Sequence, residues 1–146
     1  LDAIEHSDYD GNITLIVGAS NPNVSSLTGK VVSSDKNINL IVNSNNMAEE
    51  MVNADICIGA AGTTSWERCA LGLPTINLTI ARNQQDIATN LSVIGAAIDF
   101  GWLLHNEDTM RLTSLINSFI SDPVKCENIA VSASRVCDGL GVKRMF

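Results

Sequence analysis

The residues with the clearest chemical potential form a run of small and hydroxyl-bearing side chains. The run reads Gly-Ala-Ala-Gly-Thr-Thr-Ser-Trp-Glu over residues 59–67 and joins an apolar segment to a helical pattern. Small residues let a ligand approach the main chain closely, and the hydroxyls of Thr63, Thr64 and Ser65 add hydrogen-bond donors. The unpaired N–H groups and the positive dipole end of a helix start attract phosphate. This run, which includes Gly62, therefore indicates an anion-binding loop.

The same run also has a purely structural interpretation. Thr64 and Glu67 have the spacing of a capping box, in which Glu67 satisfies the start of its own helix. Four residues at helical spacing predict the buried face of that helix: Trp66, Cys69, Ala70 and Leu73. The run lacks the Gly-x-Gly-x-x-Gly dinucleotide fingerprint and the Gly-Lys-Ser/Thr of a P-loop. From the pattern alone, ligand binding and helix capping stay open as equal alternatives.

A second polar segment, residues 81–86, follows another apolar run and opens another helix. The side-chain amides of Asn83 and Gln84 can donate and accept hydrogen bonds, which suits sugar hydroxyls and diphosphate oxygens. The pattern alone favours the simpler alternative, in which Asn83 caps its helix. A third segment, residues 18–23, is predicted to be a plain loop and helix cap, with Pro22 at the first helical position.

No set of side chains indicates a catalytic centre or a metal site. His6 and His105 are predicted to be exposed to solvent, and no Ser/His/Asp arrangement or suggestive carboxylate pair accompanies them. The four cysteines form no Cys-x-x-Cys and stand far from both histidines: Cys57, Cys69, Cys126 and Cys137. We therefore expect no catalytic residue, no metal and no cofactor. The cysteines instead suit a reducing, cytoplasmic setting.

Composition limits the classes of partner. With 146 residues, of which 45% are hydrophobic and 17% charged, the chain fits one globular domain over residues 1–146. A net charge of −7 argues against nucleic acid, because neutralising a phosphate backbone requires clustered Lys and Arg. No apolar run reaches the roughly 18 residues of a membrane span, and no export signal is present. Basic residues are scarce around both loops, so any phosphate would depend on backbone groups, hydroxyls and helix dipoles.

Short apolar runs alternate with helical patterns, which predicts an α/β fold: a parallel sheet with helices on both faces. Five runs predict strands: residues 13–17, 38–42, 55–59, 75–80 and 96–98. Helical spacing follows each of the first four runs, and two more helices close the chain: near 22–31, 47–51, 64–71, 83–93, 112–119 and from 122 onward. Sites in such folds lie where strands end and helices begin.

The start of the chain departs from this scheme. Residues 1–6 look like the end of a helix, whereas a doubly wound domain opens with a strand, which then lies in the centre of the sheet. We therefore expect that the first strand is missing and that sheet edges are left unpaired. Two outcomes are predicted: a homodimer, or a sheet closed by pairing the 13–17 strand with the strand that begins at Asp55.

Taken in order, several stretches resemble the C-terminal domain of nucleotide-sugar enzymes with the GT-B fold: residues 18–23, 37–42, 47–62, 63–74, 83–84 and 138–144. The most specific part is Gly-Thr-Thr-Ser-Trp-Glu-Arg-Cys-Ala-Leu-Gly-Leu-Pro with Asn-Gln downstream. It is similar to the UDP-sugar hydrolase family of pseudaminic acid biosynthesis and its spore-coat polysaccharide relatives. The lipid-II-forming glycosyltransferase is a more distant likeness. The resemblance implies a Rossmann-like domain that binds a UDP-sugar.

The resemblance also implies roles for individual positions. The backbone near Val42 would read the uracil edge, Glu67 would bind the ribose hydroxyls, and Asn83 and Gln84 would face the diphosphate or the sugar. The diphosphate itself would be held by four residues: Gly62, Thr63, Thr64 and Ser65.

Members of that family carry an N-terminal domain with a Gly-rich opening and a histidine implicated in catalysis, and neither is found in this chain. The resemblance therefore implies the UDP-binding half of a hydrolase that releases UDP from a UDP-linked amino sugar, inactive by itself. Two alternatives stay open: a UDP-sugar-dependent glycosyltransferase, and a non-catalytic module that associates with itself.

Overall fold

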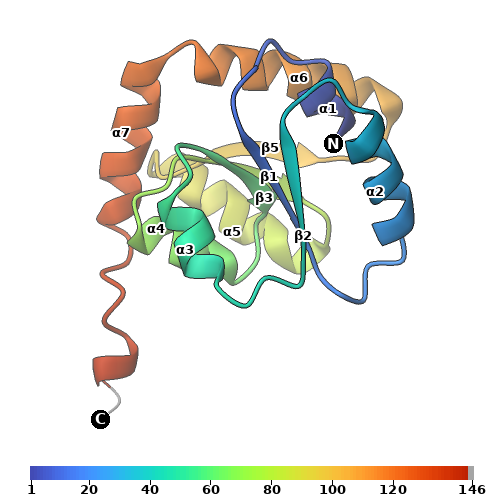
Figure 1. Cartoon of the computed structure of the whole chain (residues 1–146). Coiled ribbons are helices and arrows are strands. Elements are labelled where there is room, and N and C mark those ends of the chain that lie inside the picture. Colours follow the sequence, from blue (N-terminus) through green and yellow to red (C-terminus); the bar gives the residue numbers. More distant parts are fainter. Residues whose placement is uncertain (145–146) are drawn as a thin grey trace.

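A computed structural model describes residues 1–144 and has the expected α/β architecture, with parallel strands between helices (Figure 1). The strands are β1 (Ile13–Val17), β2 (Ile38–Val42), β3 (Cys57–Ala60), β4 (Thr75–Thr79) and β5 (Ile98–Trp102). The α-helices are α1 (Asp2–Glu5), α2 (Val24–Ser33), α3 (Met47–Val52), α4 (Thr64–Ala70), α5 (Arg82–Val93), α6 (Asn106–Ile120) and α7 (Pro123–Ser134). All observed strand pairs are parallel. The predicted fold class, a Rossmann-like parallel arrangement flanked by helices, is confirmed.

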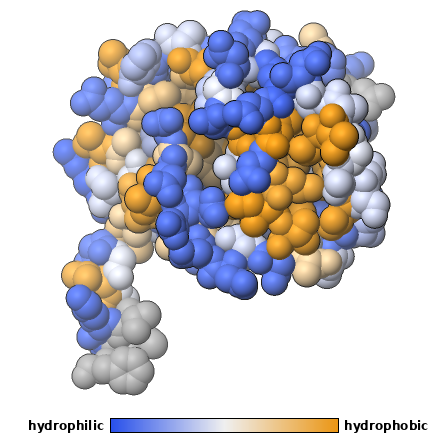
Figure 2. All heavy atoms as spheres, in the orientation of Figure 1, coloured by the Kyte–Doolittle hydropathy of each residue, from blue (hydrophilic) through white to orange (hydrophobic). Residues whose placement is uncertain are grey.

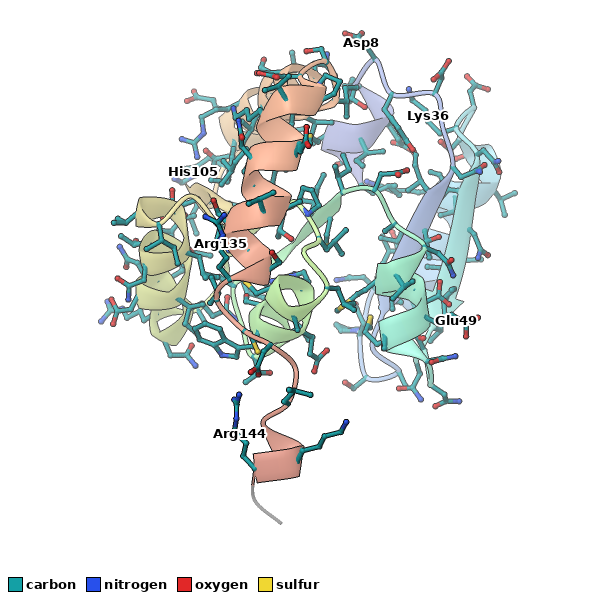
Figure 3. All side chains as sticks on the ribbon, turned by 90° about the vertical axis from the view of Figure 1, so that its left-hand side faces the viewer. Asp8, Lys36, Glu49, His105, Arg135 and Arg144 are labelled. Atoms are coloured by element: carbon teal, nitrogen blue, oxygen red, sulfur yellow. The ribbon has the colours of Figure 1, made fainter. Side chains whose placement is uncertain are left out.

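The strands are divided between two sheets. β1 pairs with β2 in one sheet, and β3, β4 and β5 pair in that order in the other. The prediction that the 13–17 strand would pair with the strand beginning at Asp55 is wrong, because β1 and β3 are not hydrogen-bonded to each other. Figure 3 shows the ribbons of the two sheets lying apart. The alternative prediction, a homodimer, stays a prediction.

The unpaired edges of β1 and β3 can be identified from their hydrogen bonds. The N–H of Ile13 donates to a carbonyl just before β2, and the carbonyl of Val17 accepts from the N–H that follows β2. In a parallel ladder alternate residues face opposite edges, so the main chain of Ile16 faces away from β2. The N–H of Cys57 donates to the carbonyl of Pro74, just before β4. By the same alternation, the main chain of Ile58 faces away from β4. β1 and β3 are therefore edge strands, each with main-chain groups left unpaired on one side.

Packing is concentrated in the β3–β5 half of the molecule. Four of the five residues of β4 are buried, whereas none of β1 or β2 is. Two buried clusters form the core: Ala3, Ile76, Phe100, Leu112, Ile116, Phe119 and Ile129, and Cys69, Leu91, Ala96, Ala97 and Ala133. Apolar side chains instead gather on the surface over β2 and toward α2 (Figure 2).

The β1–β2 half is attached to this core largely through α1 and the loop after it. Ala3 of α1 lies in the core, and Asp2 forms an ion pair with Lys30 of α2 at 2.6 Å. The ammonium group of Lys36 (labelled in Figure 3) donates to the carbonyl oxygens of Ser7 and Tyr9. These links are mostly polar, and no residue of β1 or β2 belongs to either buried cluster.

Several element boundaries differ from the prediction: β3 begins at Cys57 rather than at Asp55, and the starts of β5 and α2 are also shifted. β5 begins at Ile98, where the predicted strand ends, because Ala96 and Ala97 are buried in the turn that follows Gly95. α2 begins at Val24 rather than at Pro22, with Asn23 as its N-cap. No helix in the described part of the chain is long and apolar enough to cross a membrane.

Candidate functional site

The loop between β3 and α4, residues 61–63, presents free backbone donors at the carboxyl end of a strand. Among residues 1–144, the N–H groups of Gly62, Thr63 and Thr64 donate to no other protein group. The next N–H, that of Ser65, is already used, because it donates to the Gly62 carbonyl at 3.0 Å. Successive free N–H groups in a turn form an anion-binding concavity. Since α4 has only seven residues, these loop donors matter more than its dipole.

Gln84 lies beside this loop, as the second polar segment was predicted to do. Its Oε1 accepts from the N–H of Ile80 at 3.1 Å, which fixes the side-chain amide at the end of β4. A Cβ added to Gly62 would lie 3.9 Å from Nε2 of Gln84, so this amide nitrogen faces the loop. Asn83 is exposed and does not cap α5, whose N-cap is Ala81 without a side-chain hydrogen bond. The capping alternative for Asn83 is therefore wrong.

Glu67 is also free of a structural role. The N-cap of α4 is Thr63 and no side chain caps the helix, so the capping box of Thr64 and Glu67 is not formed. The carboxylate of Glu67 is exposed at the first turn of α4 and accepts no hydrogen bond within residues 1–144. The predicted buried positions are correct for Cys69 and Leu73, Ala70 is half-buried, and the prediction is wrong for Trp66, which is 43% exposed.

The inner face of α4 instead holds a residue that the sequence reasoning missed, Arg68. It is only 4% exposed, and its Nη2 donates to the carbonyl of Ala60 at 2.7 Å and to Oγ of Ser65 at 2.8 Å, and lies 3.2 Å from Oδ1 of Asn77. A Cβ at Gly59 would lie 2.3 Å from Nη1, so the guanidinium occupies the space that a side chain there would need. A glycine inside a strand signals such a close approach, and this signal could have identified the contact.

The other predicted positions lie apart from this loop. Val42 is at the carboxyl end of β2, in the other sheet, and is followed by Asn43 with a positive φ of 59°. Residues 18–23 form a plain turn in which Oδ1 of Asn21 accepts from the N–H of Asn23, in agreement with the prediction. His6 and His105 are exposed, also as predicted. Figure 3 labels His105.

Nothing in the described residues indicates nucleophilic or metal chemistry at the loop. Burial raises the pKa of the Cys69 thiol and that of Cys126, so both thiols stay protonated and unreactive near neutral pH. Residues 1–144 contain no group of three or more His, Cys, Asp or Glu side chains that could hold a metal ion. A hollow of about 470 Å³ lies elsewhere, between α5, α7 and the start of β5.

Known structures share this architecture at low sequence identity. The structure of Anabaena Alr3699/HepE in complex with UDP-glucose has a TM-score of 0.67 at 18% identity, and the match covers 92% of this chain and 38% of that chain. UDP-N-acetylglucosamine 2-epimerase has a TM-score of 0.66 at 16% identity, and the match covers 92% of this chain and 34% of that chain. The spinosyn rhamnosyltransferase SpnG complexed with thymidine diphosphate has a TM-score of 0.54 at 17% identity, and the match covers 92% of this chain and 42% of that chain. This chain thus spans well under half the length of each of these proteins, and the likeness shows the fold.

The family is shown by a direct match of the sequence. No curated protein matches the chain. Residues 2–115, however, match the model of the glycosyltransferase family 28 C-terminal domain, which covers most of the 146 residues. The chain belongs to the glycosyltransferase family 28 C-terminal domain family.

Proposed function

We propose that this domain binds the UDP portion of a UDP-sugar at the β3–α4 loop. The observation that carries the proposal is the set of free N–H groups of Gly62, Thr63 and Thr64 beside Nε2 of Gln84. Backbone and amide donors of this kind bind phosphate oxygens without a net positive surface, which suits a chain of net charge −7. The ligands of two neighbours, UDP-glucose and thymidine diphosphate, belong to the same chemical class and support the choice.

Each predicted residue has a role in this proposal. The loop N–H groups, with the hydroxyls of Thr63 and Thr64, bind the diphosphate, and Gln84 donates from the α5 side. Asn83, exposed at the start of α5, faces the sugar. The free carboxylate of Glu67 accepts from the ribose hydroxyls. Ser65 contributes indirectly, since its hydroxyl is buried against a guanidinium, and the backbone near Val42 reads the uracil edge.

For the complete protein we propose hydrolysis of a UDP-linked amino sugar of surface-polysaccharide or pseudaminic-type biosynthesis. Water attacks the anomeric carbon, the bond from that carbon to the diphosphate oxygen breaks, and UDP leaves with the electron pair. This domain stabilises the negative charge that develops on the leaving diphosphate. A further domain, such as the N-terminal domain that members of the resembled family carry, activates the water. A cytoplasmic location belongs to the same proposal.

Glycosyl transfer is the second candidate, and the family match favours it. The UDP site would be the same, but an acceptor hydroxyl would replace water. Product analysis with a UDP-sugar separates the two: free sugar supports hydrolysis, and sugar joined to an acceptor supports transfer.

A non-catalytic, self-associating module is the third candidate. The free edges of β1 and β3 motivate it, since unpaired strand edges invite pairing with another chain. Sedimentation velocity tests it: a dimer that dissociates when β1 carries a proline, as in Ile16→Pro, supports edge pairing. A monomer at high concentration contradicts self-association.

Calorimetric titration with UDP tests the binding proposal directly. Wild type is expected to bind UDP, and Glu67→Ala is expected to weaken binding about tenfold, the loss of one charge-assisted hydrogen bond. Glu127→Ala is the matched control, because Glu127 is an exposed glutamate on α7. The absence of detectable UDP binding, both by this chain and by a version that includes the further domain, would contradict the proposal.

A further inference from the structure

Arg68 is a buried cation without an anionic partner in the described part of the chain. Its guanidinium contacts three neutral oxygens, of Ala60, Ser65 and Asn77, and lies 3.8 Å from Sγ of Cys57. The salt bridges found among residues 1–144 do not involve it. Its Nε and the Nδ2 of Asn77 find no acceptor. A guanidinium is always protonated, and burying it without a counter-charge is costly.

The cage around this guanidinium is assembled from two strands and one helix. Gly59 of β3 pairs in register with Asn77 of β4, so paired positions present the same face of the sheet. Ser65 and Arg68 are three residues apart on α4, which places both side chains on one side of that helix. Because Gly59 has no side chain, the guanidinium can lie against the sheet and reach all three oxygens. A site built from three elements in this way holds the charge in a fixed place.

The charge lies directly behind the candidate diphosphate loop. Ala60, whose carbonyl accepts from Nη2, is the last residue of β3, and the free N–H groups of the loop begin two residues later. The expectation that phosphate binding here would depend only on backbone, hydroxyls and dipoles is therefore incomplete. One basic side chain, that of Arg68, is buried and hydrogen-bonded to the Ala60 carbonyl, at the end of the strand that leads into the loop.

We propose that Arg68 is a positioning residue of the diphosphate site: its buried charge is balanced by the diphosphate across the loop, and its hydrogen bonds hold the loop in shape. It does not touch the ligand. The inference rests on the proposed UDP binding and deepens it, because it explains selection of a nucleoside diphosphate over an uncharged nucleoside. A fixed positive charge in a partly desolvated site attracts a dianion but not an uncharged nucleoside, so its removal should weaken diphosphate binding by about tenfold or more.

The test compares UDP with uridine, both titrated by NMR so that weak binding is measurable. Arg68→Met, which removes the charge but keeps the length, is expected to weaken UDP binding at least about tenfold and to leave uridine binding within about twofold. Arg68→Lys, which restores the charge without the planar fork, is expected to recover most of the UDP affinity. Arg135→Met is the matched control, an exposed arginine at the end of α7 (Figure 3).

The outcomes are distinguishable. Unchanged UDP binding by Arg68→Met, or an equal loss for UDP and uridine, overturns the inference, since the second result is that of a purely structural residue. If wild type itself binds no UDP, the proposed function fails first and the inference fails with it. Where Arg68→Met does not fold, the Nε–H resonance of Arg68 in wild type decides: it should shift with UDP and stay in place with uridine. A resonance that UDP leaves unmoved also overturns the inference.

Discussion

A methyl group added at Gly59 should break the cage around Arg68. In Gly59→Ala the new Cβ would lie 2.3 Å from Nη1, closer than nonbonded atoms can approach. The far end of an arginine usually moves aside at little cost. Here it cannot do so freely, because the side chain is 4% exposed and its Nη2 is bonded to the Ala60 carbonyl and to Oγ of Ser65. The guanidinium must therefore give up those bonds or push the strand away.

The cost can be estimated from these contacts. A hydrogen bond to a charged group contributes about 1.5–3 kcal/mol, and overpacking a close-packed interior costs about 1–3 kcal/mol. Replacing glycine in a strand returns about 0.5–1 kcal/mol of backbone entropy. The net loss of unfolding free energy is about 3 kcal/mol. With about 2.1 cal/mol/K of unfolding entropy per residue, a 146-residue domain would lose about 10 °C in melting temperature.

Thermal and urea unfolding of four variants measure this effect: Gly59→Ala, Gly29→Ala, Arg68→Met and the double mutant of Gly59→Ala with Arg68→Met. Gly29→Ala is the control, since nothing lies within 4 Å of a Cβ there and alanine favours the α2 helix by about 0.5–1 kcal/mol. Gly59→Ala should also reduce the free energy of unfolding much less when Arg68 is already replaced by Met, because the two sites are in contact. The reasoning would be refuted if Gly59→Ala were as stable as wild type, or if the losses of unfolding free energy from the two single substitutions simply added in the double mutant.

Three further changes follow from other contacts. Gly72→Ala should cost about 2 kcal/mol in urea unfolding, because φ is +62° and the Cβ would lie 3.3 Å from the Ala130 carbonyl. Phe119→Ala, at a fully buried position, should cost about 3–5 kcal/mol in the same assay. The N–H groups of Leu104 and His105 lower the pKa of Asp108. Its contribution is therefore fully present above the unfolded pKa of about 3.9 and is lost as pH falls through the lower folded pKa. Asp108→Asn should accordingly be less stable than wild type at pH 7, and the difference should shrink as the pH is lowered below about 4, by urea unfolding across this range.

Much of the fold was predictable because the strands are short apolar runs. β1 and β2 have the predicted bounds, and β4 differs by one residue. β5 was displaced because its residues break the apolar pattern. Asp99 accepts from the N–H of Gly101 with its own side chain, at an irregularity where Asn77 pairs with Asp99 but Leu78 pairs with Gly101. A strand that contains a bulge and a local side-chain hydrogen bond loses the periodicity on which prediction depends.

The closeness of the two polar loops was predictable, but the buried surroundings of Arg68 behind them were not. The two polar loops converge because β3 and β4 are parallel neighbours, so their carboxyl ends share an edge. Arg68 was missed for a physical reason: a charged residue within an apolar helix pattern is normally exposed. Its burial depends on contacts with Gly59 and Asn77, which lie 9 residues away on either side in sequence, and helical spacing within α4 contains no information about them. Trp66 lies two residues before Arg68, on the opposite side of α4, so the helix face that buries Arg68 leaves Trp66 exposed.

The uneven packing of the two sheets has a consequence for how a nucleotide would bind. The proposed diphosphate donors and Arg68 belong to the half with the buried core, so we expect that part of the proposed site to be preorganised. Val42, proposed to read uracil, belongs to a sheet with no buried residue and with a free edge toward the other half. Ordering weakly packed elements when a ligand binds lowers the affinity. We therefore expect this loss of affinity for the nucleoside portion of the ligand and not for its diphosphate. A strand that pairs with both β1 and β3 would remove this loss. We therefore expect such a strand to raise the affinity for uridine far more than the affinity for pyrophosphate, whereas equal gains would mean that both halves of the site are equally ordered without it.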